Sequence, residues 1–350
     1  MDLMASLASG EPLDETRHDI TDVSQLKSLP AMQYAFRGEG NCSYSLCPSI
    51  YRKHNDGRRP ELGRAMNNFA AMLKNASDYC FANDSGRQNL AIELFVGAAQ
   101  HYRLSTPMMD WTTDPCVAVA FAADYDPKEH LSVVYALPMF RAVQHNATFY
   151  LPPPFVERLY LQRGFFIETK EKKDDEALQE SCIRILFKED KAFKVIRNGA
   201  EIADLMKPLP ALDALALHAK ELAKNGTQLI NDDMKTPEEA DRILTDEWNK
   251  IGGIPDFLQP DMGEQHAEAW REYILEMIER ISHLRTKEGL KVNKFILQPV
   301  VCTNKQMMTA FQKWLEIQEK WAREEAKNED AARGWGDLAK LLKQLLSECK

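Results

Sequence analysis

The sequence predicts an α+β fold, in which a sheet is flanked by helices and followed by a helical C-terminal extension. Three observations predict it. Short runs rich in β-branched and aromatic residues recur through about the first 190 positions, helical periodicity separates these runs, and helical patterns dominate from about residue 210 onward. The 350 residues are enough to bury a large core, as one domain or two.

The first expected element is a strand near the N-terminus. Residues 1–28 are acidic and polar with little periodicity, and we expect them to be a loosely packed lead-in. From Gln33 to Arg37 the pattern alternates, as in a strand that ends at Gly38-Glu39-Gly40. Helices are predicted over 61–82 and 88–99, because apolar residues recur there at intervals of three and four.

Two further strands are expected around a helix. Residues 108–111 have the pattern of a short strand. The next element begins at Asp114-Pro115, where a good N-cap residue is followed by proline at the first helical position. Ser132 to Leu137 is β-branched and aromatic and ends before Pro138, which predicts a core strand.

The middle of the chain continues with strands and connectors. Pro152-Pro153-Pro154 is expected to be a rigid connector. Residues 159–167 predict a strand that is broken or bulged at its glycine. Residues 170–180 carry mixed charges and are expected to form an exposed loop, and further strands are predicted at 183–188 and 294–301.

The last segment, 303–350, is charged and helical. It carries an apolar stripe of five leucines at helical spacing, and a stripe of this width packs against something. One interpretation is docking on the chain's own domain, and the other is a partner protein or self-association. The stripe consists of Leu338, Leu341, Leu342, Leu345 and Leu346.

Composition bounds the class of protein. The net charge of −9 argues against nonspecific coating of nucleic acid, and no run of apolar residues is long enough for a membrane span. The first residues lack the basic start of a secretory signal. The seven cysteines are scattered without zinc spacing, so we expect reduced thiols, no structural metal and a cytoplasmic protein.

One local cluster is basic although the chain as a whole is acidic. Five basic residues lie within thirteen positions that contain only two acids. They are interpreted either as a solvated loop and helix start or as a patch that contacts phosphate. The basic residues are Arg52, Lys53, Arg58, Arg59 and Arg64.

The strongest functional signal is the segment from Gln100 to Pro115. It gathers a histidine, a tyrosine, aspartates, a tryptophan and threonines in sixteen positions, directly before the apolar run at 116–122. Polar and aromatic groups this dense at an element boundary suit a ligand pocket better than a core. The helix start at Asp114 adds free N–H groups that attract anions such as a pyrophosphate.

Arg37 is the second candidate. Its guanidinium can hold a phosphate or carboxylate through two hydrogen bonds, and Gly38 and Gly40 let a ligand approach the backbone closely. The alternative is an internal ion pair with Glu39 or Asp110.

Each polar group of the second segment also has a structural alternative. His101 titrates near neutrality and Tyr102 offers a flat face and a hydroxyl, yet a histidine before an aromatic residue is commonly a hydrogen-bonded core group. Asp110, before Trp111 and Thr112, acts on a ligand or caps the helix region that follows.

These segments resemble the FRG domain, named for its aromatic-Arg-Gly signature and common in bacteria and their phages. The resemblance rests on five ordered matches. The domain it implies covers 29–266, between the lead-in 1–28 and a mostly helical extension 267–350 with the strand near 294–301. The matches are 36–38, 44–52, 100–112, Gln162-Arg163-Gly164-Phe165-Phe166, and Gly253 to Phe257 with Pro260-Asp261.

A wider resemblance links the chain to ADP-ribosyltransferases that use NAD, which implies a split mixed sheet. By this resemblance Arg37, Gly38, Tyr102, Trp111 and Thr112 bind NAD, and a second set of three residues is catalytic. The resemblance implies a bacterial or phage toxin or antiphage effector that modifies RNA or protein, with an antitoxin or other partner on the C-terminal helices. The catalytic residues would be Asp110, Gln162 and His101.

The chain departs from that pattern on the third strand. No Glu-x-Glu is present there, and Gln162 is the polar residue best placed. A carboxylate normally stabilises the charge that builds on the ribose, so Asp110 would have to supply it. The alternative is a non-catalytic nucleotide-binding or interaction module. A nuclease is disfavoured, because the sequence holds no carboxylate cluster with metal-binding spacing.

Overall fold

The structure is a computed structural model, and it describes most of the chain. The described residues are 34–77, 93–123, 131–145, 147–150, 159, 162–169, 172–187, 196–197, 200–201, 209–230, 236–255, 273, 305–324, 327 and 329–347. The predicted lead-in 1–28, the connector 152–154, the strand 294–301 and the motif at 256–261 lie outside these residues.

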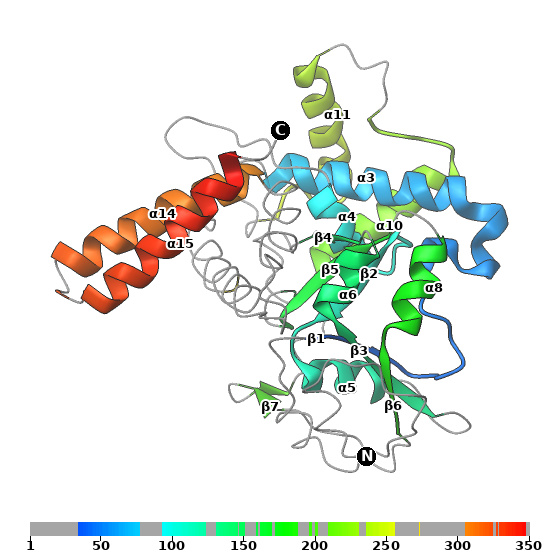
Figure 1. Cartoon of the computed structure of the whole chain (residues 1–350). Coiled ribbons are helices and arrows are strands. Elements are labelled where there is room, and N and C mark those ends of the chain that lie inside the picture. Colours follow the sequence, from blue (N-terminus) through cyan, green and yellow to red (C-terminus); the bar gives the residue numbers. More distant parts are fainter. Residues whose placement is uncertain are drawn as a thin grey trace.

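A six-stranded sheet forms the centre of the molecule (Figure 1). Its strand order is β4-β5-β2-β1-β3-β6, and all five pairings are antiparallel. The expectation of a mixed sheet is therefore wrong for these strands. Their bounds are β1 Tyr34–Glu39, β2 Met108–Thr112, β3 Ser132–Pro138, β4 Thr148–Tyr150, β5 Gly164–Glu168 and β6 Ile183–Phe187.

Helices cover both faces of this sheet, and a small separate ribbon pairs β7 (Ile196–Arg197) with β8 (Ala200–Glu201). The predicted α+β class is confirmed. The helices are η2 Ser49–Tyr51, η3 Lys53–Arg58, α3 Arg59–Ser77, α4 Glu93–Gln100, α5 Pro115–Ala123, α6 Met139–Gln144, α8 Lys172–Glu180, α10 Pro210–Lys224, α11 Pro237–Lys250, α14 Lys305–Glu324 and α15 Glu329–Ser347.

One face of the sheet is covered by α5, which packs on β1 and β3. The contact is close because Gly38 has no side chain. A Cβ built there would lie 1.8 Å from the carbonyl oxygen of Ala118 and 2.8 Å from the nitrogen of Ala122. Gly38 is therefore required for packing of this helix on the central strand.

The opposite face carries the main core. Helix α4 lies against β2 and β4, and α3 packs on α4 and α10. Gly97 of α4 allows the same kind of close approach, because a Cβ there would lie 2.4 Å from the Phe166 ring. Trp248 of α11 is buried against α3 and donates a hydrogen bond of 3.0 Å to the carbonyl of Met72.

Two expectations for 159–180 are wrong. The strand begins only at Gly164, because residues 162–163 form a turn in which Arg163 has a φ of 48°. Residues 172–180 form helix α8 rather than a loop. Leu178 supplies a fully buried side chain, and buried Asp175 accepts a hydrogen bond from Thr169, so the charged segment has an inner face.

The C-terminal helices α14 and α15 pack together as a hairpin that projects to one side of the molecule (Figure 1). Leu342 and Leu345 of the predicted stripe are buried, which supports docking within the chain. Gly336 faces Glu319 of α14. Within the part of the chain that the structure describes, no helix is long and apolar enough to cross a membrane.

Candidate functional site

The candidate site lies where β1 and β2 separate. These strands share a single residue pair, Phe36 opposite Thr112, whereas β1 pairs with β3 at six positions. Beyond that pair the side chain of Arg37 spans the gap, and its Nη1 donates to the main-chain carbonyl of Asp110 at 2.7 Å and to the Asp110 carboxylate. At this point the guanidinium of Arg37, and not a pair of backbone hydrogen bonds, connects β1 to β2.

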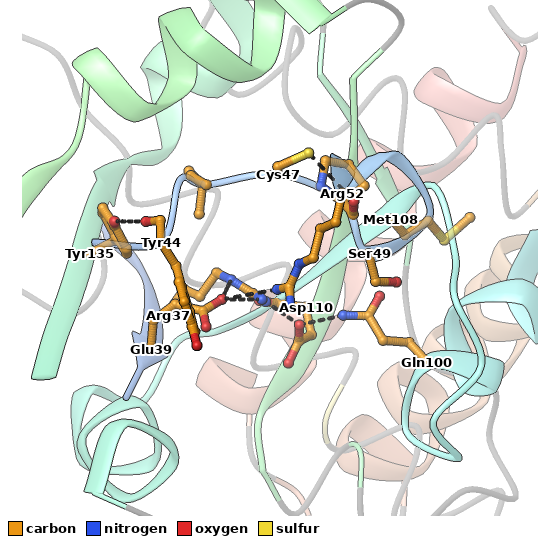
Figure 2. Close-up of polar contacts among 12 residues, drawn as sticks. Arg37, Glu39, Tyr44, Cys47, Ser49, Arg52, Gln100, Met108, Asp110 and Tyr135 are labelled. Carbon is orange, nitrogen blue, oxygen red and sulfur yellow. Dashed lines mark hydrogen bonds and ion pairs between the residues drawn. The ribbon is translucent and has the colours of Figure 1, made fainter. Parts of the chain in front are cut away.

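A second carboxylate holds the other side of this guanidinium. Nε and Nη2 of Arg37 donate to Oε1 of Glu39 at 3.1 and 2.6 Å (Figure 2). Burial lowers the pKa of Arg37, but the charges of Asp110 and Glu39 outweigh it and raise that pKa above its usual value. The internal ion pair, one of the two interpretations of Arg37, is therefore present.

Asp110 is held from a third direction by helix α4. Gln100 donates from Nε2 to Oδ1 of Asp110 at 2.5 Å, and its own Oε1 accepts from the hydroxyl of Thr106 at 2.7 Å. Burial raises the pKa of Asp110, but the positive charges of Arg37 and His101 lower it below the usual value overall. The carboxylate is ionised and fixed in place.

A small cavity lies at this separation of the strands, which we call the notch. Its volume is about 20 Å³, room for one water molecule. Two buried donors on its lining residues, Nε1 of Trp111 and Nε2 of Gln162, have no hydrogen-bond partner among the residues that the structure describes. The lining residues are Phe36, Arg37, Gly38, His101, Asp110, Trp111, Thr112, Val117, Phe121, Gln162 and Gly164.

The notch therefore unites Arg37, His101, Asp110 and Gln162 from four separate segments. The His101 ring packs edge-on against Phe166, with the ring centroids 5.7 Å apart. Tyr102, expected at the NAD site, does not line the notch. It is fully buried and packs on the Phe69 ring of α3, so it belongs to the core.

Three of the expected binding residues have structural contacts. Gly38 lines the notch, but its lack of a side chain is required by α5. Trp111 is 2% exposed and belongs to the core cluster. The hydroxyl of Thr112 donates to the carbonyl of Gln162 at 2.7 Å and accepts from the N–H of Asp114 at 3.0 Å, so it fixes the turn that presents Gln162.

The start of α5, which the sequence suggests as an anion site, is capped by a side chain of its own. The carboxylate of Asp114 accepts a hydrogen bond of 2.9 Å from the N–H of Cys116, as its predicted role of N-cap requires. A negative charge thus occupies the helix N-terminus. An incoming phosphate would be repelled there.

The comparisons with known proteins find one family. The sequence model of the FRG domain matches 32–130, a range that contains Arg37, Asp110 and the strands that carry them. Residues 32–130 are an FRG domain. No curated protein matches the chain, and no solved structure does. Gln162, the notch residue on the turn before β5, lies beyond the matched range.

A second, larger pocket opens beside the notch of the FRG domain. It has a volume of about 900 Å³ and lies between residues of 43–59 on one side and Thr169 with Asp175 of α8 on the other. Its wall meets the notch network at Arg52, whose Nη2 lies 3.8 Å from Oε1 of Glu39 (Figure 2). The lining residues are Ser43, Tyr44, Ser45, Cys47, Tyr51, Arg52, Lys53, His54, Asp56, Arg59, Thr169 and Asp175.

Sequence reasoning missed part of this site. It named Glu39 only as an alternative partner of Arg37, and it gave Gln100 no role although Gln100 begins the polar segment. The position of Gln100 in the last turn of α4 was the available signal, because the end of that helix leads directly to β2. The predicted basic cluster supplies three residues of the larger pocket, Arg52, Lys53 and Arg59.

Proposed function

We propose that the FRG domain binds NAD at the notch and transfers ADP-ribose to a macromolecular acceptor, as a bacterial or phage toxin or antiphage effector. The single observation that carries the proposal is the convergence of Arg37, His101, Asp110 and Gln162 on one cavity. The buried donors of Trp111 and Gln162, which have no acceptor within the described part of the chain, support it, because such donors are rare and suit an incoming oxygen atom.

The size of the notch sets a condition on binding. A cavity of about 20 Å³ does not admit a nicotinamide ring, so the contact between Arg37 and Asp110 has to open when NAD enters. Arg37 then exchanges a carboxylate partner for a phosphate or ribose oxygen of NAD. The amide of Gln162 would donate to the ligand, and His101 would border the nicotinamide end.

The reaction breaks the bond between the nicotinamide nitrogen and the ribose. The bonding electrons leave with nicotinamide, positive charge builds on the ribose, and an acceptor nucleophile bonds to the ribose carbon and loses its proton. The ionised Asp110 carboxylate is the group assigned to stabilise that charge. Losing such a preorganised contact costs about 3 kcal/mol of barrier, on the order of a hundredfold in rate.

The test is incubation of the chain with adenine-labelled NAD and cell extract, with released nicotinamide measured in parallel. We expect labelled acceptor from the unaltered chain and loss of both signals in Arg37→Ala and Asp110→Ala. Asp110→Asn keeps the shape and removes the charge, so it separates charge from folding. Transfer that survives Arg37→Ala and Asp110→Ala alike excludes these residues from the mechanism.

A second candidate is a nucleotide-binding module without chemistry. Two features favour it: Arg37 is already neutralised by Asp110 and Glu39, and Gln162 stands where the resemblance expects a glutamate. This candidate predicts that NAD raises the melting temperature in a saturable manner while no nicotinamide is released. Release of nicotinamide by the unaltered chain, absent in Asp110→Asn, would exclude it.

A further inference from the structure

The pocket of about 900 Å³ has the size of a ligand site, whereas the notch does not. Glu39 links the two, because its Oε1 accepts from Arg37, which lines the notch, and lies 3.8 Å from Nη2 of Arg52, which lines the pocket. Figure 2 shows the Arg52 side chain extending toward the Arg37 network. A molecule in this pocket would therefore lie next to a reaction in the notch.

Charge favours an anionic occupant. Arg52, Lys53 and Arg59 line the pocket against the acids Asp56 and Asp175. Arg59 donates to Asp56 at 2.5 Å, and Asp175 is 4% exposed and accepts from the hydroxyl of Thr169. Arg52, a third exposed, shares Glu39 with Arg37, and Lys53 is exposed, so the pocket lining carries one more cation than acids.

Two aromatic rings distinguish the pocket from a simple basic patch. Tyr44 and Tyr51 are 43% and 45% exposed. The Arg59 guanidinium lies over the Tyr51 ring, 5.6 Å from its centroid. Exposed rings beside cations provide stacking surfaces for bases and contacts for phosphates, the combination that binds single-stranded nucleic acid.

We propose that this pocket binds one or two nucleotides of a single-stranded nucleic acid. An acidic peptide would use the cations but not the tyrosine rings, and a duplex keeps its bases stacked away from the pocket. The inference deepens the proposed function, because it names the acceptor class for the transfer of ADP-ribose. The binding itself requires neither NAD nor Asp110.

The test is fluorescence anisotropy of a labelled, unstructured 12-nucleotide RNA with the full chain. Lys53→Glu is compared with Lys340→Glu, which makes the same charge change at a residue 78% exposed on α15. We expect Lys53→Glu to weaken binding about tenfold and Lys340→Glu to change it less than about twofold. Lys53→Ala should lower the slope of log affinity against log salt by about 0.7, the value for one lost phosphate contact.

Tyrosine variants test the stacking. Tyr44→Ala is expected to weaken binding about tenfold, and Tyr44→Phe should bind like the unaltered chain. Tyr44→Ala keeps the main-chain carbonyl that accepts a hydrogen bond of 3.1 Å from the Tyr135 hydroxyl. AMP as competitor distinguishes a free nucleotide from a strand: the proposal requires the RNA to bind more tightly.

Four results would overturn the inference. The first is that Lys53→Glu and Lys340→Glu weaken RNA binding equally, and the second is that a duplex binds as tightly as the single strand. The third is that AMP competes as well as unlabelled RNA does. The fourth is that a polyglutamate peptide competes fully while Tyr44→Ala has no effect on RNA binding. The last result would indicate an acidic protein instead. Because RNA binding is measured without NAD, and nicotinamide release without RNA, failure of one proposal is distinguishable from failure of the other.

Discussion

The role of Gly38 can be decided by one substitution. The sequence suggests that the missing side chain of Gly38 lets a ligand approach the backbone, whereas the structure places the backbone of α5 there. In Gly38→Ala the new Cβ would lie 1.8 Å from the carbonyl oxygen of Ala118, and ordinary contact begins at 3.4 Å. Helix α5 would have to move by more than an ångström.

The expected cost follows from that overlap. Inserting atoms into a packed interior costs about 1–3 kcal/mol, and here the neighbour is backbone that no rotamer change can remove. We therefore expect Gly38→Ala to lower the free energy of unfolding by about 3 kcal/mol or more. The notch should be disturbed together with it, since Val117 and Phe121 of α5 line that cavity.

Gly63→Ala is the matched control. Gly63 lies inside α3, and a Cβ built there meets nothing within 4 Å. Alanine in a helix interior is more favourable than glycine by about 0.5–1 kcal/mol, so this variant should be more stable than the unaltered chain. Urea denaturation followed by circular dichroism measures both. If Gly38→Ala unfolds within about 1 kcal/mol of the unaltered chain, the close-packing explanation is wrong and ligand approach is the better one.

Three further predictions concern the notch and the core. Burial raises the pKa of Asp110 but Arg37 lowers it below the ordinary 3.8, so stability from this pair is complete above pH 3.8 and falls as the pH drops toward the folded-state pKa. In an acid-unfolding experiment, the stability of Asp110→Asn should not show the fall with pH that protonation of Asp110 causes. Thr112→Val should cost about 2 kcal/mol in urea and reduce NAD binding, because the turn that presents Gln162 loses two hydrogen bonds, and Thr112→Ser should restore both. Trp248→Phe should cost about 1–2 kcal/mol in the same assay, since the indole hydrogen bond is lost, and an unchanged midpoint would contradict the assignment.

The sequence by itself determined the elements whose signals are local. Alternation and β-branching located β1, β2, β3 and β6, periodicity located α3 and α4, and Asp114-Pro115 marked the start of α5. These signals depend on neighbours within a few positions. The FRG domain was recognisable in the same way, because its motifs are short and ordered.

Charged segments were harder to interpret. The segment that forms α8 carries mostly polar residues, and only its packing shows that Asp175 and Leu178 face inward. The turn at 162–163 replaces the start of the predicted strand because the Thr112 side chain holds the Gln162 carbonyl from 50 residues away. No local pattern contains that information.

Tertiary structure alone decided how the candidate residues are used. Arg37 and Asp110 are 73 residues apart in the sequence, and only the fold shows that their side chains contact each other. The candidate residues could be selected from the sequence, because the chemistry of a side chain does not depend on the fold. The partners of these residues could not be predicted from the sequence. The order of the strands places the Arg37 guanidinium beside the carboxylates of Asp110 and Glu39, and helix α5 packs against Gly38.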